Sequence, residues 1–259
     1  MRILFIGDIV GKPARNYLAN HLQKIISKNE IDLVIANGEN AAGGAGITEK
    51  VYAELIDMGI DLITGGNHTW DRKDIYNILE REEGLIRPAN LPTNTTPGRG
   101  AAVLIKENVK IGVINLIGRV FMNPADCPFR AAEREIKNLK KETNLIIVDF
   151  HAEATSEKQA MGWYLDGKVS AVLGTHSHVQ TADCRILNRG TAFISDVGMV
   201  GKYDSILGVD IEGALQRFIT RLPHKLEISE GKVLFNAVII DLDIGSGKAL
   251  EIKPISEIF

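Results

Sequence analysis

Strand-like and helix-like segments alternate from the start of the chain, and this alternation restricts the possible folds more than any other feature. RILFIG (2–7) is typical of a buried strand, and apolar residues then recur every four positions over 14–26, as on one face of a helix. DLVIAN (32–37) is a second strand. A helix over 48–59, with Thr48 as its N-cap, leads to a short third strand, DLIT. This β-α-β-α-β order predicts a sheet with parallel strands.

The second half of the chain is richer in strands. AAVLI (101–105) and KIGVINL (110–116) are predicted to pair, a helix is expected over 124–141, and NLIIVDF (144–150) is the most apolar strand. One later helix carries an apolar face of Ile211, Leu215, Phe218 and Leu222. Further strands are expected at VSAVLGTHSH (169–178), CRILN, GTAFIS, KVLFNAVIIDLDI and KALEIKPI. The two halves together predict an α/β (α+β) fold, with two packed mixed β-sheets and helices outside.

We expect a single domain over residues 1–259, because this length suits one large domain and no linker-like or low-complexity tract interrupts it. Charged residues make up 24% of the chain and the formal net charge is -3, without the basic stripe that non-specific nucleic-acid binding requires. We therefore expect no duplex nucleic acid as a partner. No run approaches the roughly 20 apolar residues of a membrane span, so no membrane is expected either.

The compartment follows from the N-terminus and the cysteines. The first apolar run is short and interrupted by Asp8, unlike a secretory signal. Cys127 and Cys184 lack a CxxC spacing, which favours reduced structural thiols over a disulfide or a metal role. We expect a cytoplasmic protein. Its oligomeric state stays open, with a homo-oligomer as one alternative.

Polar residues gather where the predicted strands end. In α/β proteins the carboxyl ends of strands are where binding sites form, because the loops leave the sheet there. Five strand ends carry a carboxylate, an amide or an imidazole: Asp8, Glu39 with Asn40, Asn67 with His68, His151, and His176 with His178.

Each of these residues also has an ordinary structural explanation. Asp8 is a candidate helix or turn cap, Glu39 and Asn40 fit a polar loop, and Asn is common in turns. The pair His176 and His178 is more informative, because imidazole is the commonest transition-metal ligand and two of them at one strand end can converge. Their joint occurrence with the other strand ends predicts a metal site.

Counting donors predicts two metal ions rather than one. Seven candidate ligand side chains are too many for one tetrahedral zinc ion, but they suit two five- or six-coordinate ions that share a carboxylate. Glu39 is the natural bridge between the ions. The seven are Asp8, Glu39, Asn40, Asn67, His151, His176 and His178.

Other enzyme motifs are absent or incomplete. GDIVGK (7–12) is one residue too short for a phosphate-binding P-loop, and Pro13 stands where Ser or Thr is needed. Neither a G-x-S-x-G elbow nor an HExxH motif occurs. The remaining rival to an enzyme is a non-enzymatic regulator that keeps the metal site for structure or for sensing a nucleotide.

Six stretches between residues 7 and 201 resemble the YmdB-like branch of bacterial metallophosphoesterases, in the calcineurin-like phosphoesterase superfamily. They are GDIVGKPAR, NGENAAGGAGIT, GGNHTWD, FHAEATSEK, GTHSHVQTAD and SDVGMVG. The resemblance implies the metallophosphoesterase fold, a four-layer αββα sandwich of two mixed sheets flanked by helices. It also implies a dinuclear site and a small phosphodiester substrate, 2',3'-cyclic or alternatively 3',5'-cyclic nucleotides.

The resemblance also implies a role for each candidate residue. One ion would take Asp8, Glu39, Asn40 and His178, and the other would take Glu39, Asn67, His151 and His176. A metal-bridging hydroxide would attack phosphorus, and His68 would donate a proton to the leaving oxygen. Around these residues, Asp71, Glu153, Asp183 and Asp196 are candidates for orienting the histidines, although capping or solvation explains them equally well.

The chain departs from the broad superfamily at two positions. Val10 stands where most members have a histidine, and Glu39 stands where most have a bridging aspartate. Both residues resemble the YmdB-like branch itself. Loss of an imidazole at Val10 makes the first ion's ligand shell richer in oxygen, which manganese and iron tolerate well. We therefore expect two divalent or trivalent ions, either iron or manganese.

Overall fold

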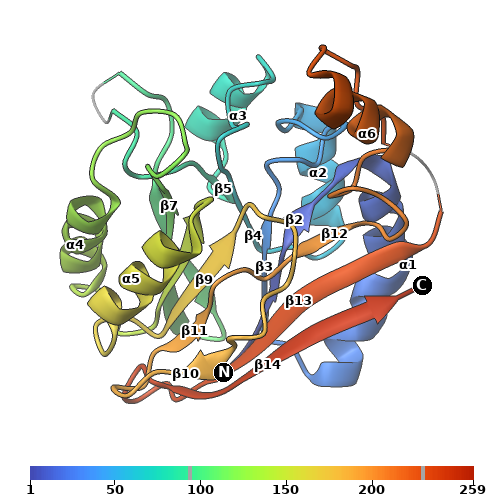
Figure 1. Ribbon diagram of the computed structural model, residues 1–259. Coiled ribbons are helices and arrows are strands. Elements are labelled where there is room, and N and C mark those ends of the chain that lie inside the picture. The colour runs from blue at the N-terminus through green and yellow to red at the C-terminus, as the bar shows by residue number, and fades with distance from the viewer. Residues whose placement is uncertain (93–94, 229–230) are drawn as a thin grey trace.

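The computed structural model describes residues 1–92, 95–228 and 231–259, and over these ranges two mixed β-sheets pack face to face between helices (Figure 1). Buried apolar side chains from both sheets fill the space between them. Among these are Phe5, Ile35, Val113, Ile147 and Leu173. The predicted pair of packed sheets is therefore confirmed.

The larger sheet has the strand order β2-β12-β13-β1-β3-β4-β5, and β14 pairs with β13. β1, β3, β4 and β5 run parallel, as the alternation of strands and helices predicts, whereas β13 is antiparallel to β1. The strands are β1 (Arg2–Ile6), β2 (Asp8–Ile9), β3 (Leu33–Asn37), β4 (Leu62–Thr64), β5 (Leu85–Ile86), β12 (Met199–Lys202), β13 (Val233–Leu242) and β14 (Ala249–Ile258).

The smaller sheet has the order β10-β11-β9-β8-β7-β6. Its middle strands β7, β8, β9 and β11 are parallel, and the two edge strands are antiparallel to their neighbours. The strands are β6 (Ala101–Lys106), β7 (Val109–Ile117), β8 (Ile146–His151), β9 (Ala171–Thr175), β10 (Arg185–Ile186) and β11 (Ala192–Ile194). The predicted pairing of 101–105 with 110–116 is confirmed as the β6–β7 hairpin.

Helices cover the outer face of each sheet and complete four layers (Figure 1). Apolar side chains of α1, α2 and α3 pack on the larger sheet, and those of α4 and α5 pack on the smaller sheet. The helices are α1 (Gly11–Asn29), α2 (Glu49–Asp57), α3 (Ile75–Arg81), α4 (Pro128–Leu139), α5 (Thr155–Leu165) and α6 (Ile211–Thr220).

The two predicted N-terminal helices form for the expected reasons. Ala14, Leu18 and Leu22 of α1 are fully buried on one face. Thr48 caps α2, because its hydroxyl accepts a hydrogen bond from the backbone N–H of Val51 at 3.3 Å.

Three predicted boundaries are wrong. The first strand stops at Ile6, and Asp8 begins a separate strand, β2, that pairs with β12. The helix expected over 124–141 begins only at Pro128, because proline fits the first helical turn, where an N–H has no partner. The strand expected over 169–178 ends at Thr175.

Three short strands and two helices do not follow from the periodicity. β2, β5 and β12 contain only two to four residues. α5 buries the charged residues Glu157 and Lys158 beside Met161, so its buried face does not look apolar in the sequence. α3 is a single short helix of 7 residues.

The apolar face of α6 is exposed rather than packed. The helix lies at the edge of the molecule (Figure 1), and it buries Gly213 and Ala214 instead. The exposed fractions are 47% for Ile211, 46% for Leu215 and 74% for Phe218. Leu222 follows the helix and is 66% exposed.

The sequence predicts that the two cysteines are reduced and that no segment spans a membrane. Cys127 and Cys184 are free thiols. Among the described residues, no helix combines the length and the apolar character needed to cross a bilayer.

Candidate metal centre

The carboxyl ends of five neighbouring strands meet at one edge of the two sheets. Asp8 lies in β2, Glu39 and Asn40 follow β3, and Asn67 follows β4. His151 is the last residue of β8, and His176 and His178 follow β9. Gly7 lets the chain reach this edge, because a Cβ there would lie 2.0 Å from the backbone oxygen of Gly198.

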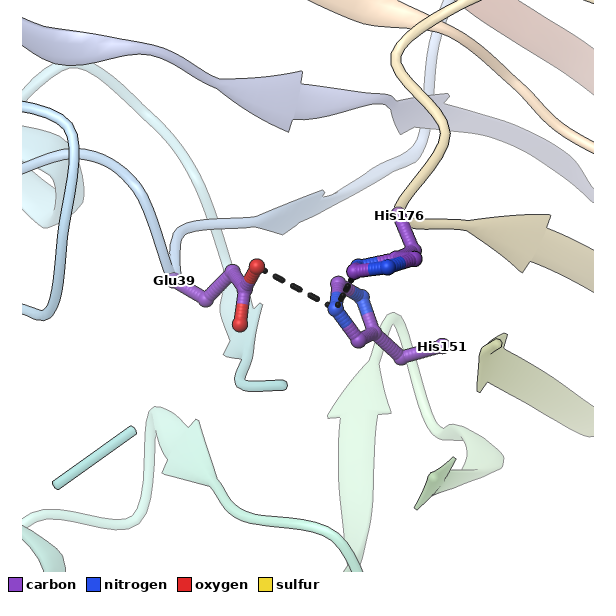
Figure 2. A group of neighbouring side chains, drawn as sticks. All are labelled: Glu39, His151 and His176. Carbon is purple, nitrogen blue, oxygen red and sulfur yellow. Dashed lines mark hydrogen bonds and ion pairs between the residues drawn. The ribbon is translucent and has the colours of Figure 1, made fainter. Parts of the chain in front are cut away.

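Three atoms with lone pairs converge on the imidazole of His151. Its Nε2 lies 2.9 Å from Asn67 Oδ1, 3.1 Å from Glu39 Oε1 and 3.0 Å from His176 Nδ1. Figure 2 shows Glu39 and His176 directed at His151 from different sides. His151 and Glu39 are buried, and the side chain of His176 is 23% exposed.

A second group of candidate metal-ligand side chains lies beside the first. Asn40 Nδ2 is 3.2 Å from His178 Nε2 and 3.1 Å from Glu39 Oε1. Asp8 Oδ1 lies 3.9 Å from His178 Nε2, and this buried oxygen has no hydrogen-bond partner among the described residues. Because Glu39 Oε1 contacts both Asn40 and His151, this carboxylate joins the two groups.

The loop after β9 is held in an unusual conformation. His176 and His178 have positive φ angles of 101° and 64°, which non-glycine residues adopt only when surrounding contacts enforce them. Asp8 Oδ2 accepts a hydrogen bond from the backbone N–H of His176 at 3.1 Å. Asp196 accepts one from the N–H of Ser177 at 2.9 Å and one from Lys158 Nζ at 2.6 Å.

Burial and the mutual charges shift the pKa values of these groups. Burial raises the pKa of Asp8 to about 6. Burial opposes the ionised form of Glu39 too, but the charge and hydrogen bond of His151 prevail and lower the pKa of Glu39 to about 2.

The two central imidazoles shift in opposite directions. The pKa of His151 rises to about 9, because the carboxylates of Glu39 and Asp8 outweigh the effect of burial. The pKa of His176 falls to about 3, through burial and the neighbouring His151. The centre therefore favours a positive charge between the carboxylates, while it keeps His176 neutral as a lone-pair donor.

The donor types of these residues fit a metal centre. Carboxylate, amide oxygen and imidazole are the donor types that manganese, iron and zinc accept. The space between the donors is tight: a Cβ on Gly66 would lie 2.3 Å from Glu39 Oε2 and 2.6 Å from His151 Nε2. An orphaned carboxylate oxygen on Asp8 adds a further free ligand atom.

His68 lies beside the two groups of donors rather than within them. Its Nδ1 is 2.8 Å from Asp71 Oδ2, and its side chain is 40% exposed. Its backbone N–H donates to Glu39 Oε2 at 2.8 Å, which fixes the residue next to the centre. The imidazole is thus oriented by a carboxylate and accessible from solvent.

Of the four carboxylates that were candidates for orienting the histidines, three contact a histidine or the loop that carries two of them. Asp71 contacts His68, Glu153 Oε2 lies 3.0 Å from His176 Nε2, and Asp196 anchors the loop between His176 and His178. Asp183 instead accepts hydrogen bonds from Thr181 and Ser195, and these contacts are those of a structural cap.

Sequence reasoning missed a second set of polar residues behind the centre. Asp149 lies inside the most apolar strand, two residues before His151, and Thr175 precedes His176. Asn37 ends β3, and Lys158 lies on the unpredicted helix α5. One sequence feature could have revealed this set: Asp149 is a carboxylate within an otherwise apolar, buried strand. A buried carboxylate needs hydrogen-bond partners, so polar residues are expected around it.

The two-sheet sandwich with this cluster at its strand ends has the fold of the metallophosphoesterases. Among solved structures, a phosphatase from Mycoplasma pneumoniae matches with a TM-score of 0.93 and 36% identity, covering 100% of this chain and 93% of that one. A hypothetical protein from Thermus thermophilus has a TM-score of 0.93 and 42% identity, covering 100% of this chain and 99% of that one.

The chain belongs to the YmdB-like protein family, whose model matches residues 4–255. A 2',3'-cyclic-nucleotide 2'-phosphodiesterase of Bacillus subtilis (strain 168) is 51% identical over 255 residues, 98% of this chain and 96% of that protein. A putative phosphatase/phosphodiesterase of Mycoplasma pneumoniae is 37% identical over 98% of this chain and 92% of that protein. The resemblance inferred from the six motifs is therefore confirmed.

Proposed function

We propose that this protein is a dinuclear-metal phosphodiesterase that hydrolyses small phosphodiesters, and that its substrates are 2',3'-cyclic nucleotides. The observation that carries the proposal is the convergence of Asn67 Oδ1, Glu39 Oε1 and His176 Nδ1 within 3.1 Å of His151 Nε2. The substrate class follows the name of the 51% identical relative. Two thiols without a disulfide agree with a reducing, cytoplasmic compartment.

We propose that the seven candidate ligands divide into two sets, one for each ion. Glu39 would be shared, because its Oε1 contacts both sets. When bound, the ions would activate a water molecule as the nucleophile and withdraw charge from the phosphoryl oxygens. Iron or manganese suits the oxygen-rich first set. That set is Asp8, Glu39, Asn40 and His178, and the second is Glu39, Asn67, His151 and His176.

His68 would act as the general acid. As an imidazolium, His68 would carry a proton on both nitrogens: Nδ1–H donates to Asp71, and Nε2–H is left to face the substrate. Hydrolysis breaks one P–O bond, and the departing ribose oxygen takes that proton. This step matters because a ribose alkoxide is a poor leaving group.

Metal reconstitution and a substrate panel test the proposal. The protein is stripped with a chelator, reloaded with Mn²⁺ or Fe²⁺, and assayed on 2',3'-cyclic AMP, 3',5'-cyclic AMP and bis-p-nitrophenyl phosphate. We expect turnover that depends on metal and is fastest on the 2',3'-cyclic nucleotide. Binding of the nucleotide without turnover by either metal form would contradict the proposal.

A further inference from the structure

A buried polar network stands directly behind His151. Asp149 lies two residues earlier on β8, where its side chain is completely buried between the sheets. Its Oδ1 accepts a hydrogen bond from Thr175 Oγ1 at 2.7 Å, and its Oδ2 accepts one from Thr64 Oγ1 at 2.5 Å. Asn37 Nδ2 donates to the same Oδ2 at 3.1 Å. The carboxylate thus has donors on both oxygens, which is what an ionised group needs at this depth.

Thr175 connects this carboxylate to the histidine. Its Oγ1 lies 3.0 Å from His151 Nδ1 and 2.7 Å from Asp149 Oδ1. A threonine hydroxyl has one hydrogen to donate. If it went to His151, Asp149 Oδ1 would lose the one donor that the described residues supply. The hydroxyl therefore donates to Asp149 and accepts from His151 Nδ1–H.

Asn37 does not change this assignment. Its Nδ2 has two hydrogens, and the shorter contacts, 3.0 Å to Gly65 O and 3.1 Å to Asp149 Oδ2, use both. Its distance of 3.5 Å from His151 Nδ1 is longer than either. His151 Nδ1 is therefore left with Thr175 Oγ1 as its acceptor.

We propose that Thr175 and Asp149 are positioning residues that fix His151 in the Nδ1–H tautomer and direct its Nε2 lone pair at the donors of Glu39, Asn67 and His176. This inference rests on the proposed metal centre. A neutral imidazole can offer a lone pair on only one nitrogen, so the hydrogen bond at Nδ1 decides which atom can hold an ion.

The same network also fixes two other loops of the centre. Asn37 Oδ1 accepts from the backbone N–H of Glu39 at 3.1 Å, and Asn37 Nδ2 donates to the carbonyl oxygen of Gly65, two residues before Asn67. Because Asp149 holds this amide, one buried carboxylate links the ends of β3, β4, β8 and β9.

The wild-type protein loaded with Zn²⁺, a diamagnetic probe, tests the tautomer without any mutation. Long-range ¹H–¹⁵N spectra report which imidazole nitrogen carries the proton. We expect His151 to carry it on Nδ1, with slow exchange against solvent because the site is buried. A proton on Nε2 of His151 would overturn the proposal.

Matched variants test the effect on metal affinity. Thr175→Val keeps the side-chain shape but removes the acceptor, so Zn²⁺ affinity, measured against a competing chelator, should fall about tenfold or more. Thr175→Ser restores the hydroxyl and should return the affinity close to that of the wild type. The control is Thr191→Val, which removes another buried hydroxyl that donates to Val169 O at 2.7 Å, and it should leave the affinity unchanged.

The outcomes separate this inference from the function on which it rests. Unchanged Zn²⁺ affinity in Thr175→Val, with tight binding by the wild type, would overturn the positioning role and leave the metal centre standing. A wild-type protein that binds no Zn²⁺ would overturn both. If Thr175→Val fails to fold, the wild-type spectra and the Thr175→Ser affinity still decide the question.

Discussion

The imidazole of His151 has a defined partner on each of its nitrogens. Nδ1 meets Thr175 inside the protein, and Nε2 meets Asn67, Glu39 and His176 at the strand ends. Polar residues at strand ends could be identified from the sequence, because their positions follow from where each apolar run stops. Thr175 and Asp149 could not, because a hydrogen-bond network between two sheets depends on how the sheets pack.

His68→Gln should retain metal and lose turnover selectively. On a 2',3'-cyclic nucleotide we expect a loss of about 100-fold or more in kcat, which is the usual contribution of a general acid. On bis-p-nitrophenyl phosphate the loss should be much smaller, because p-nitrophenolate leaves without a proton. Metal content and both rates are measured on the same preparation, and equal losses on the two substrates would exclude His68 as the acid.

Cys184 should react slowly with iodoacetamide. Burial, and to a smaller degree Asp183, raise the pKa of its thiol to about 11, from an ordinary value of 9.0. Since the thiolate is the reactive form, a raised pKa leaves the thiol protonated at pH 8. Between about pH 9 and pH 10 its alkylation rate, followed by mass spectrometry, should still rise nearly tenfold, whereas an ordinary thiol levels off. A plateau above pH 9 would contradict the shift.

At the level of elements, the ends of the strands are less predictable than the strands themselves. β9 stops at Thr175 because His176 adopts a φ of 101°, and that conformation depends on Asp8 and Asp196 from distant segments. Local sequence contains no information about those contacts. The exposed apolar face of α6 shows the same limit, because periodicity identifies a helix face but not whether anything packs on it.

A substitution at Gly66, in the loop after β4, tests whether a metal ion binds between the candidate ligands Glu39 and His151. A methyl group at Gly66 would lie 2.3 Å from Glu39 Oε2 and 2.6 Å from His151 Nε2, so Gly66→Ala should greatly weaken metal binding. Gly66 has no positive φ, and the backbone itself can accept alanine. The control is Gly245→Ala, whose Cβ would meet Asp243 Oδ1 at an ordinary 3.6 Å. Calorimetric titration with Mn²⁺ compares the two, and wild-type affinity in Gly66→Ala would contradict the geometry.

At the scale of the whole molecule, the αββα sandwich brings together residues from 8 to 178 in the sequence. The alternating first half and the strand-rich second half together were enough to predict two packed mixed sheets with helices outside. The order of strands within the sheets was not predictable in the same way, since β13 inserts beside β1 from the far end of the chain. The single-domain organisation stays a prediction.

Anomalous diffraction from crystals soaked in Mn²⁺ tests the central claim most directly. We predict two peaks about 3.5 to 4 Å apart, with Glu39 between them. One peak should be bound by Asp8, Asn40 and His178, and the other by Asn67, His151 and His176. A single peak, or none among these side chains at saturating Mn²⁺, would contradict the account.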